Sequence, residues 1–484
     1  MGAGRALRRT FWLVSGQVVL CVDVGSTFTK ACAVDLATGR LLGTAEHPTT
    51  IGGRPVGRKP AETLGWAQAD VMAGISALRA ALAGVAPHAE MLVCSSAGGG
   101  LRLAVVGYER EISAEAGHRV ALSAGARVVH VSAGRLDEAG VALLVEAAAD
   151  LVLIVGGTDG GEASVLLHNA AAMGAAGLGV PVVVAGNAVV RTEVCALLAA
   201  AGVTAVPADN VLPDIGELDP ESARTAIRGV FLEHVIGGKG LSADPDFAGL
   251  VRAVTPDAVL SGVSVLAEQI RSEPGRVGSG SIVVVDVGGA TTDVYCVLSP
   301  DAEQAMLGRE AVGVPSHRRT VEGDLGLRWT ADALLAAAES ERLVSAAEAE
   351  SFVAWAAARS EVVGPPESEL DRANELRLAG LAVMIAIRRH VRAESAYGVT
   401  GTAGASARSA STVILSGGAI RHASPGERAD LVASVLADRG GARGVLLGAD
   451  VRCDSQYVLA AAGLLAAEFP AAAAGLVRAS GLVD

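Results

Sequence analysis

Two short stretches of this sequence combine a carboxylate, glycines and hydroxyl side chains in the same order. They are Asp23-Val-Gly-Ser-Thr-Phe-Thr-Lys30 and Asp286-Val-Gly-Gly-Ala-Thr-Thr-Asp293. Each follows an apolar run typical of a buried strand, so each predicts a tight turn between strands. Such a turn presents backbone N–H groups and hydroxyls to an oxyanion, and its aspartate can hold a hydrated Mg²⁺ beside phosphates. One copy alone is ordinarily a simple hairpin, whereas two matched copies favour a nucleotide held between two halves.

A third glycine element, Leu415-Ser-Gly-Gly-Ala-Ile420, also follows a buried strand. The paired glycines Gly417 and Gly418 allow a flat molecule such as a nucleoside to lie close to the backbone. Glycines at such a place equally often serve only to pack a helix on a strand. After two phosphate-type turns, however, this element is the expected third part of a nucleotide site.

Composition excludes several classes of protein. The chain has 484 residues, of which 51% are apolar and 19% charged, and its formal net charge is −13. Disorder requires low hydrophobicity and high charge density, which is the reverse of this balance. General nucleic-acid binding depends on clustered basic charge, so we expect no nucleic-acid partner. A soluble α/β protein of two to four units remains.

No membrane span is expected. The longest charge-free stretch, from Ala163 to Val190, is long enough to cross a bilayer but is interrupted by glycines, asparagines and a proline. Residues 1–17 carry three arginines ahead of an apolar run without a small-residue cleavage site, and we interpret them as a loose leader. The six scattered cysteines form no CxxC pair, which favours buried thiols in a reducing cytoplasm.

The order of strand-like and helix-like segments divides the chain into units. We predict a first subdomain over residues 18–149, an inserted α/β unit over 150–272, a flexible joint, and a second subdomain over 281–484. The inserted unit opens with the buried run Leu151–Val155, which leads into Gly156-Gly-Thr-Asp-Gly-Gly161. That loop could bind a second anion or simply form a tight turn. Glu322, Asp324 and Arg328 could line the cleft, face a partner or cap structure.

The three glycine motifs, in this order, resemble the superfamily of actin, heat-shock chaperones and sugar and acetate kinases. Further segments, including Cys94–Arg102, Val155–Gly161, Arg319–Gly326 and Asp454-Ser-Gln-Tyr457, resemble the MutL (GlmL) family of glutamate (methylaspartate) mutase accessory proteins, which is unrelated to the mismatch-repair protein of that name. The resemblance covers nearly the whole chain. It implies two ribonuclease-H-like, actin-like ATPase subdomains that close on Mg·ATP.

The resemblance also assigns roles to single residues. Asp23 would lie near Mg²⁺, and Asp286 would orient the attacking water and lie near the metal as well. Lys30 matches the basic end of the first turn, or is a solvated lysine at a strand end. The remaining residues expected to contact the nucleotide are Gly25, Ser26, Thr27 and Thr29 in the first turn, Gly288, Gly289, Thr291 and Thr292 in the second, and Gly417 and Gly418 beside the adenosine.

The function implied is an ATPase that serves subunits of an adenosylcobalamin-dependent mutase as an accessory or reactivating factor. The alternatives are a sugar- or acetate-type kinase, for which no convincing general base is evident, and a non-hydrolysing ATP-binding scaffold. The first turn also resembles that of activators of 2-hydroxyacyl-CoA dehydratases, but those hold an iron–sulfur cluster and the cysteine spacing here argues against one. A homodimer is possible.

Overall fold

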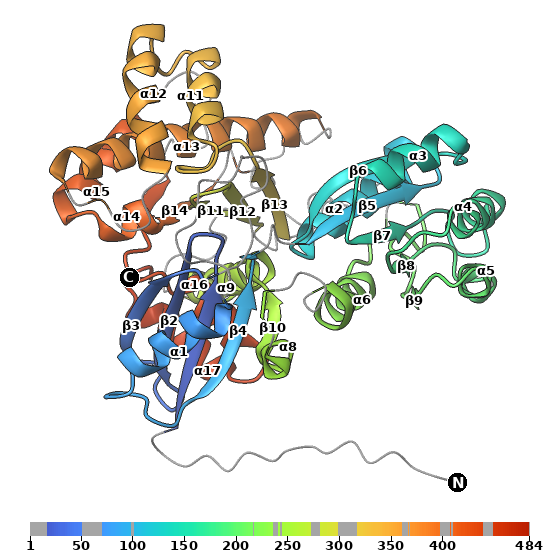
Figure 1. Ribbon diagram of the computed structural model, residues 1–484, viewed down its shortest axis with the longest axis horizontal. Helices are drawn as coiled ribbons and strands as arrows, with labels where there is room; N and C mark the ends of the chain where they lie inside the picture. The colour runs from blue at the N-terminus through green and yellow to red at the C-terminus, as the bar shows by residue number, and fades with distance from the viewer. Residues whose placement is uncertain are drawn as a thin grey trace.

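The architecture is three five-stranded sheets with helices packed against them (Figure 1). Residues 1–16 of the predicted leader and 273–280 of the predicted joint lie outside the described part of the chain. The computed structural model describes residues 17–50, 70–97, 101–215, 217–235, 241–242, 244–272, 281–298, 317–360, 366, 368–396, 407, 410–438 and 449–483.

Two of the sheets have the same topology. In each, three antiparallel strands form a meander, and two further strands pair in parallel beside the first one. The orders are β3–β2–β1–β4–β10 and β13–β12–β11–β14–β15. The first sheet comprises β1 (Val18–Val24), β2 (Phe28–Asp35), β3 (Leu41–Pro48), β4 (Glu90–Ser95) and β10 (Val251–Val254). The second comprises β11 (Ile282–Val287), β12 (Thr292–Val297), β13 (His317–Glu322), β14 (Thr412–Gly417) and β15 (Asp450–Cys453).

This repeated order is that of a ribonuclease-H-like unit, so the predicted fold class is confirmed. The central strands are buried on both faces because their sequences are continuous β-branched runs, such as Ile282-Val-Val-Val285 in β11. The next-to-last residue of β1 and of β11 is the aspartate of a predicted turn. The matching topology therefore places the two turns at equivalent edges of the two sheets.

The third sheet is entirely parallel, in the order β6–β5–β7–β8–β9. Its strands are β5 (Arg102–Gly107), β6 (Arg127–Ala133), β7 (Leu151–Ile154), β8 (Val182–Val184) and β9 (Ala205–Pro207). This grouping corrects the predicted boundaries, because β5 and β6 were expected in the first subdomain and β10 in the inserted unit. The chain leaves the first sheet after β4 and returns to it at β10.

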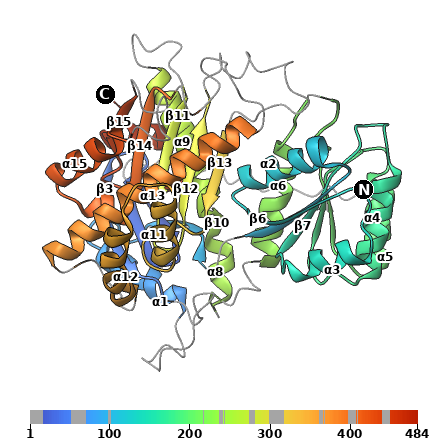
Figure 2. The same ribbon diagram turned by 90° about the horizontal axis from the view of Figure 1, so that it is seen from above.

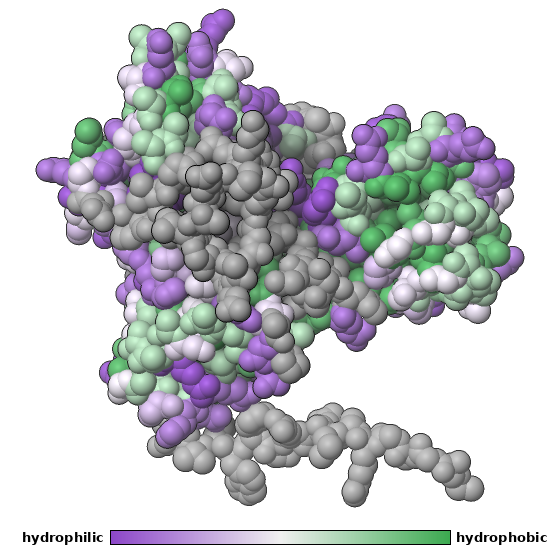
Figure 3. Space-filling view, in the orientation of Figure 1, coloured by the Kyte–Doolittle hydropathy of each residue, from purple (hydrophilic) through white to green (hydrophobic). Residues whose placement is uncertain are grey.

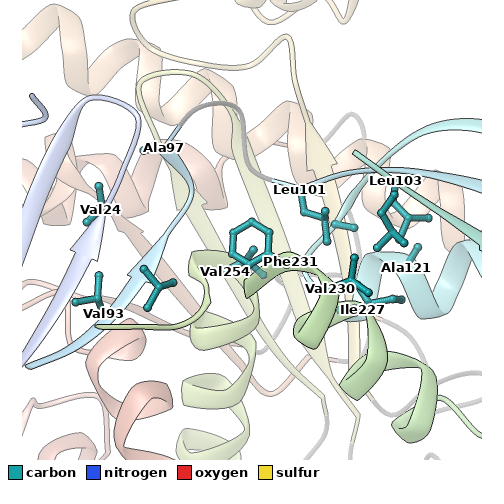
Figure 4. Packing of buried hydrophobic residues seen from close by; sticks show 14 of the residues in the cluster. Val24, Val93, Ala97, Leu101, Leu103, Ala121, Ile227, Val230, Phe231 and Val254 are labelled. Atoms are coloured by element: carbon teal, nitrogen blue, oxygen red, sulfur yellow. The ribbon is translucent and has the colours of Figure 1, made fainter. Parts of the chain in front are cut away.

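The misplaced boundary has a physical cause. β4 and β5 are both short apolar runs, and sequence periodicity predicts a strand without indicating its sheet. Moreover, one continuous core joins the first sheet to the inserted one. Figure 4 shows Phe231 and Val254 between Val93 of the first sheet and Ile227 of the inserted unit. No break in packing therefore marks the junction.

Helices cover the sheets and fill the space between the two halves (Figures 1 and 2). The first half has α1 (Val71–Ala81), α8 (Pro245–Leu250) and α9 (Thr255–Arg271). The inserted unit has η2 (Arg110–Ala114), α2 (Glu115–Ser123), α3 (Glu138–Glu146), α4 (Ser164–Ala175), α5 (Arg191–Ala200), α6 (Glu221–Val230) and η3 (Phe231–Val235). The second half has α11 (Ala331–Ser340), α12 (Ala346–Ser360), α13 (Glu369–Ala396), α14 (Gly418–His422) and α15 (Pro425–Leu436). Helices α16 (Leu459–Ala466) and α17 (Pro470–Ala479) follow them in the chain but pack against α9 and the first sheet.

Helices α9 and α16 hold the two halves together. Their apolar side chains share one buried cluster with residues of β1 and β11. The helices cross at glycines, and the approach is so close that a Cβ atom on Gly463 would lie 1.7 Å from the carbonyl oxygen of Ala258. A Cβ on Gly262 would likewise lie 1.9 Å from that of Leu459. Only glycine permits this crossing.

Within the described ranges, no helix is long and apolar enough to cross a membrane. The stretch from Ala163 to Val190 forms α4, a loop and β8, as its interruptions predicted. Figure 3 shows apolar residues gathered on the visible face of the inserted unit. Large apolar side chains exposed on this unit are Tyr108, Leu143, Val145, Val189, Leu197 and Ile215.

We predict that Gly463→Ala destabilises the protein, because the added methyl group must push α9 and α16 apart. Overpacking of this kind costs about 1–3 kcal/mol, and urea unfolding followed by circular dichroism would measure the loss. The matched control is Gly229→Ala in α6, where a Cβ meets no atom within 4 Å. That change should be neutral or slightly stabilising. Equal stability of the Gly463→Ala variant and the unchanged protein would contradict the close crossing.

Candidate functional site

The two predicted turns join matching strand pairs. In the first hairpin Asp23 lies opposite Lys30, and in the second Asp286 lies opposite Asp293. Each turn is closed by the N–H of its glycine: Gly25 donates to the carbonyl of Phe28 at 3.1 Å, and Gly288 donates to that of Thr291 at 2.9 Å. The sequence repeat is therefore a structural repeat, with one turn in each half.

The tips of the two turns touch. A Cβ atom on Gly289 would lie 2.5 Å from the hydroxyl oxygen of Thr27, so only glycine fits at this contact. The Thr27 hydroxyl is buried and has no hydrogen-bond partner among the described residues. Arg328 is bonded to the second turn through its backbone N–H, which donates to the carbonyl of Gly289. Its guanidinium lies 5.5 Å from the ring centroid of Phe28 in the first turn. The structure thus brings the two turns into one site.

The two aspartates meet at a tyrosine. The hydroxyl of Tyr457 lies 3.4 Å from Oδ2 of Asp23 and 3.4 Å from Oδ2 of Asp286. The ammonium group of Lys30 lies over the same ring, 3.6 Å from its centroid. Asp23 also accepts a 2.5 Å hydrogen bond from Thr255, at the start of α9. Sequence reasoning noted Tyr457 within a family-like segment but gave it no role, and it missed Thr255.

Burial governs the ionisation of this cluster. The pKa of Asp286 is raised to about 6, chiefly by burial; Lys30 lowers it, and the carboxylates of Asp293, Asp23 and Asp454 contribute to the rise. Burial likewise raises the pKa of Tyr457 well above its usual value, with the nearby aspartates adding to the effect. The phenol therefore remains a hydrogen-bond donor. A site with this excess of carboxylates is suited to a cation.

Some of the predicted phosphate ligands support the turns instead. The buried hydroxyl of Thr29 bonds to that of Thr49 at 3.1 Å, and Thr49 in turn donates to the carbonyl of Gly25. Thr292, also buried, donates to the carbonyl of Leu325 at 2.7 Å. These geometries correct the expected roles of Thr29 and Thr292, because their hydroxyls are already used inside the protein.

Other predicted ligands remain in place. Ser26 is partly exposed at the tip of the first turn, beside Thr27. The hydroxyl of Thr291 donates its proton to Oδ2 of Asp293 at 3.2 Å. Its oxygen can therefore still accept a hydrogen bond or bind a cation, but it has no second proton to donate. Backbone groups around Gly288 and Gly289 form the rest of the second turn. The carbonyl of Gly289 accepts from the N–H groups of Arg328 and Trp329, both at 2.9 Å.

The third glycine element lies beside the second turn. Gly417 ends β14 with a φ of +128°, and a Cβ there would lie 2.3 Å from the carbonyl oxygen of Val287. Both observations require glycine. Gly418 begins α14, and a Cβ there would meet open space. The same helix contacts the first half, since His422 lies 3.0 Å from Glu46 of β3. The three predicted elements therefore lie around one site between the halves.

A buried ion pair fixes the second turn. Arg319 of β13 donates to Oδ1 of Asp293 at 2.6 and 2.9 Å, and to the carbonyl of Ala126 in the inserted unit at 3.3 Å. This one guanidinium therefore connects the turn to the inserted unit. Helix α6 of that unit is held separately, because Arg224 and Arg228 pair with the buried Asp257 of α9.

The residues whose roles stayed open now have partners. Glu322 and Asp324 both pair with Arg389 of α13, at 2.8 and 2.6 Å. Arg328 lies 3.7 Å from Glu375, also on α13. Glu322, Asp324 and Arg328 thus tie the segment behind the second turn to a long helix, which is structural support.

The glycine-rich loop after β7 is bonded internally. The side chain of Asn187 accepts from the N–H of Gly160 and donates to the carbonyls of Gly161 and Glu162. Asn210 donates to Gly157 and to Asp159. Of the two interpretations left open, these contacts favour a tight turn over an anion site.

The residues at the meeting of the turns fit a magnesium nucleotide. No three His, Cys, Asp or Glu side chains of the described chain gather closely enough to hold a metal ion by themselves. Mg²⁺, however, commonly takes one or two carboxylates and completes its shell with water and substrate phosphates. Asp23 and Asp286 supply two such carboxylates, and the unpartnered Thr27 hydroxyl lies where the tips of the two turns touch.

We predict that Arg319→Met destabilises the protein by about 3 kcal/mol, because Asp293 would stay buried without its cation. Urea unfolding measures the loss, and Asp293→Asn in the same chain should restore part of it. The control is Arg191→Met, whose partner Asp209 is much more exposed, and which should cost about 1 kcal/mol or less. Equal losses from the two arginine variants would show that Arg319 does not act as a buried partner.

Comparison with known proteins places the chain in a family. Its relative "Protein MutL" from Clostridium tetanomorphum is 33% identical over 473 residues, which cover 95% of this chain and 98% of the relative. Two solved structures are less similar to this chain. A nucleotide-free acetone carboxylase is 13% identical, with 94% and 71% of the two chains covered and a TM-score of 0.36.

The second structure is the activator of 2-hydroxyisocaproyl-CoA dehydratase from Clostridium difficile with bound ADPNP. It is 10% identical, with 94% and 96% of the chains covered and a TM-score of 0.30. A structural likeness this loose carries no argument about the present chain. The sequence match is different, because a family model described as "MutL protein" covers residues 19–480. With nearly its whole length matched, the chain belongs to the MutL protein family.

Proposed function

We propose that this protein binds Mg·ATP between its two ribonuclease-H-like halves and hydrolyses it. The observation that carries the proposal is the meeting of two matched turns, one from each half, with Asp23 and Asp286 sharing the hydroxyl of Tyr457. Two such carboxylates, bare glycine backbone and a lysine form an array suited to a metal-bound polyphosphate.

The proposed reaction requires few chemical groups from the chain itself. When bound, Mg²⁺ would neutralise the charge that develops on the phosphates, and Asp23 and Asp286 are the residues that would hold it. Phosphoryl transfer otherwise requires positioning and electrostatic stabilisation rather than a covalent nucleophile. Asp286 would orient the attacking water. The N–H groups around Gly288 and Gly289 would bind phosphate oxygens, and the open space at Gly418 would accept the adenosine.

We further propose that the protein is an accessory factor of an adenosylcobalamin-dependent mutase. The support is the MutL family match over nearly the whole chain, including the segments between the nucleotide motifs. In this proposal ATP hydrolysis is coupled to movement of the halves, and the protein acted on is the mutase with damaged cofactor. Arg319 connects the second turn to the inserted unit and so offers one physical link for such coupling.

The first prediction from this proposal is that Asp286→Asn lowers the rate of ATP hydrolysis at least about 100-fold. The variant loses the carboxylate that would orient the attacking water, and removal of a single stabilising group in an active site costs this much. Phosphate release by the purified protein, alone and with its mutase subunits, is the measurement. The mutase should stimulate release from the unchanged protein.

The control is Asp324→Asn, a carboxylate of the same half that pairs with Arg389 on the outside of the site. It should leave hydrolysis unchanged. Absence of ATP binding by calorimetry would contradict the whole proposal. Binding without hydrolysis would instead favour the scaffold, and transfer of the phosphate to a small metabolite would favour a kinase.

A further inference from the structure

The three ionisable residues predicted for the site contact one side chain. Asp23 and Asp286 lie at the hydroxyl of Tyr457, each at 3.4 Å, and Lys30 lies on its ring face at 3.6 Å. These residues come from both halves of the protein, whereas Tyr457 lies just before α16. The tyrosine therefore occupies the centre of the site proposed for the metal and the phosphates.

We propose that Tyr457 is a latch on this site: its hydroxyl and ring hold Asp23, Asp286 and Lys30 to one another, and a magnesium nucleotide binds only when these contacts are given up. The inference rests on the proposed nucleotide site, and it adds a residue that competes with the ligand. The competition follows from simple chemistry. The oxygens of the two aspartates that face the phenol are the ones that a shared cation would use.

The contacts are of a kind that a ligand can replace. A phenol has one proton to donate, so it cannot satisfy both carboxylates at once, and both distances are long for O–H···O bonds. The lysine gains a cation–π contact with the ring. Bound phosphates offer the same ammonium group a full opposite charge.

The backbone and the packing around Tyr457 agree with a movable side chain. Its φ is +55°, a region that bulky residues seldom adopt. The following residue, Val458, donates its N–H to Asp454 at 3.3 Å, which fixes the chain on either side of the strained position. Beside the buried ring lies a cavity of about 10 Å³, about the smallest that can hold one water, which Asp23 and Lys30 help to line.

The test is Tyr457→Phe, which removes the hydroxyl and keeps the ring under Lys30. In the presence of Mg²⁺, calorimetry should show that the variant binds a non-hydrolysable ATP analogue roughly three- to tenfold more tightly than the unchanged protein does. The hydrogen bonds that oppose binding are gone, and the two carboxylate oxygens that faced the phenol have lost its proton. When the metal is chelated, Tyr457→Phe and the unchanged protein should bind the analogue with the same affinity. A merely structural role would not produce a gain that depends on magnesium.

The matched control is Tyr108→Phe, the same change at a half-exposed tyrosine of the inserted unit, which should leave both affinities unchanged. Wild-type or weaker binding of the magnesium nucleotide by Tyr457→Phe overturns the latch. Equal tightening with and without magnesium overturns it as well. If neither the variant nor the unchanged protein binds nucleotide, the proposed function itself fails, and the two failures are thereby distinguished.

Discussion

The structure depends on bringing two carboxylates of separate halves to one place. Asp23 and Asp286 each lie one residue before the end of the central strand of a sheet, and they come together at the hydroxyl of Tyr457. Like charges this close in a buried site repel each other, which is one reason why the pKa of Asp286 is raised to about 6. The surrounding contacts must overcome that repulsion, and Lys30 on the tyrosine ring is the nearest compensating charge.

Three kinds of contact hold the halves in this position. The α9–α16 crossing at Gly262 and Gly463 brings the helices to backbone distance, and their apolar faces share a core with both sheets. Arg319 pairs with Asp293 and reaches the inserted unit. The inserted unit shares its core with the first sheet, so these two units are packed together. Residues of all three units therefore lie next to the place where the two turns meet, or contact residues that do.

The repeated motifs made much of this predictable from sequence. An apolar run followed by Asp-Val-Gly indicates a strand and a turn wherever it occurs, and two copies indicate two similar sheets. Which hydroxyls face a ligand was not predictable, because the partners of Thr29 and Thr292 are distant in sequence or lie in loops. The same limit applies to Tyr457, because it contacts residues more than 150 positions away in the sequence. It also applies to β5, because packing decides which sheet this strand joins and local periodicity does not encode that packing.

The central claim is that one nucleotide binds to both halves at once. Hydrogen exchange with and without a non-hydrolysable Mg·ATP analogue tests it most directly. The account predicts that amides of residues 24–30, 287–292 and 416–420 become protected together, because the two turns and the third glycine element would line one site. Protection of only one turn, or of residues 156–161 in its place, would contradict it.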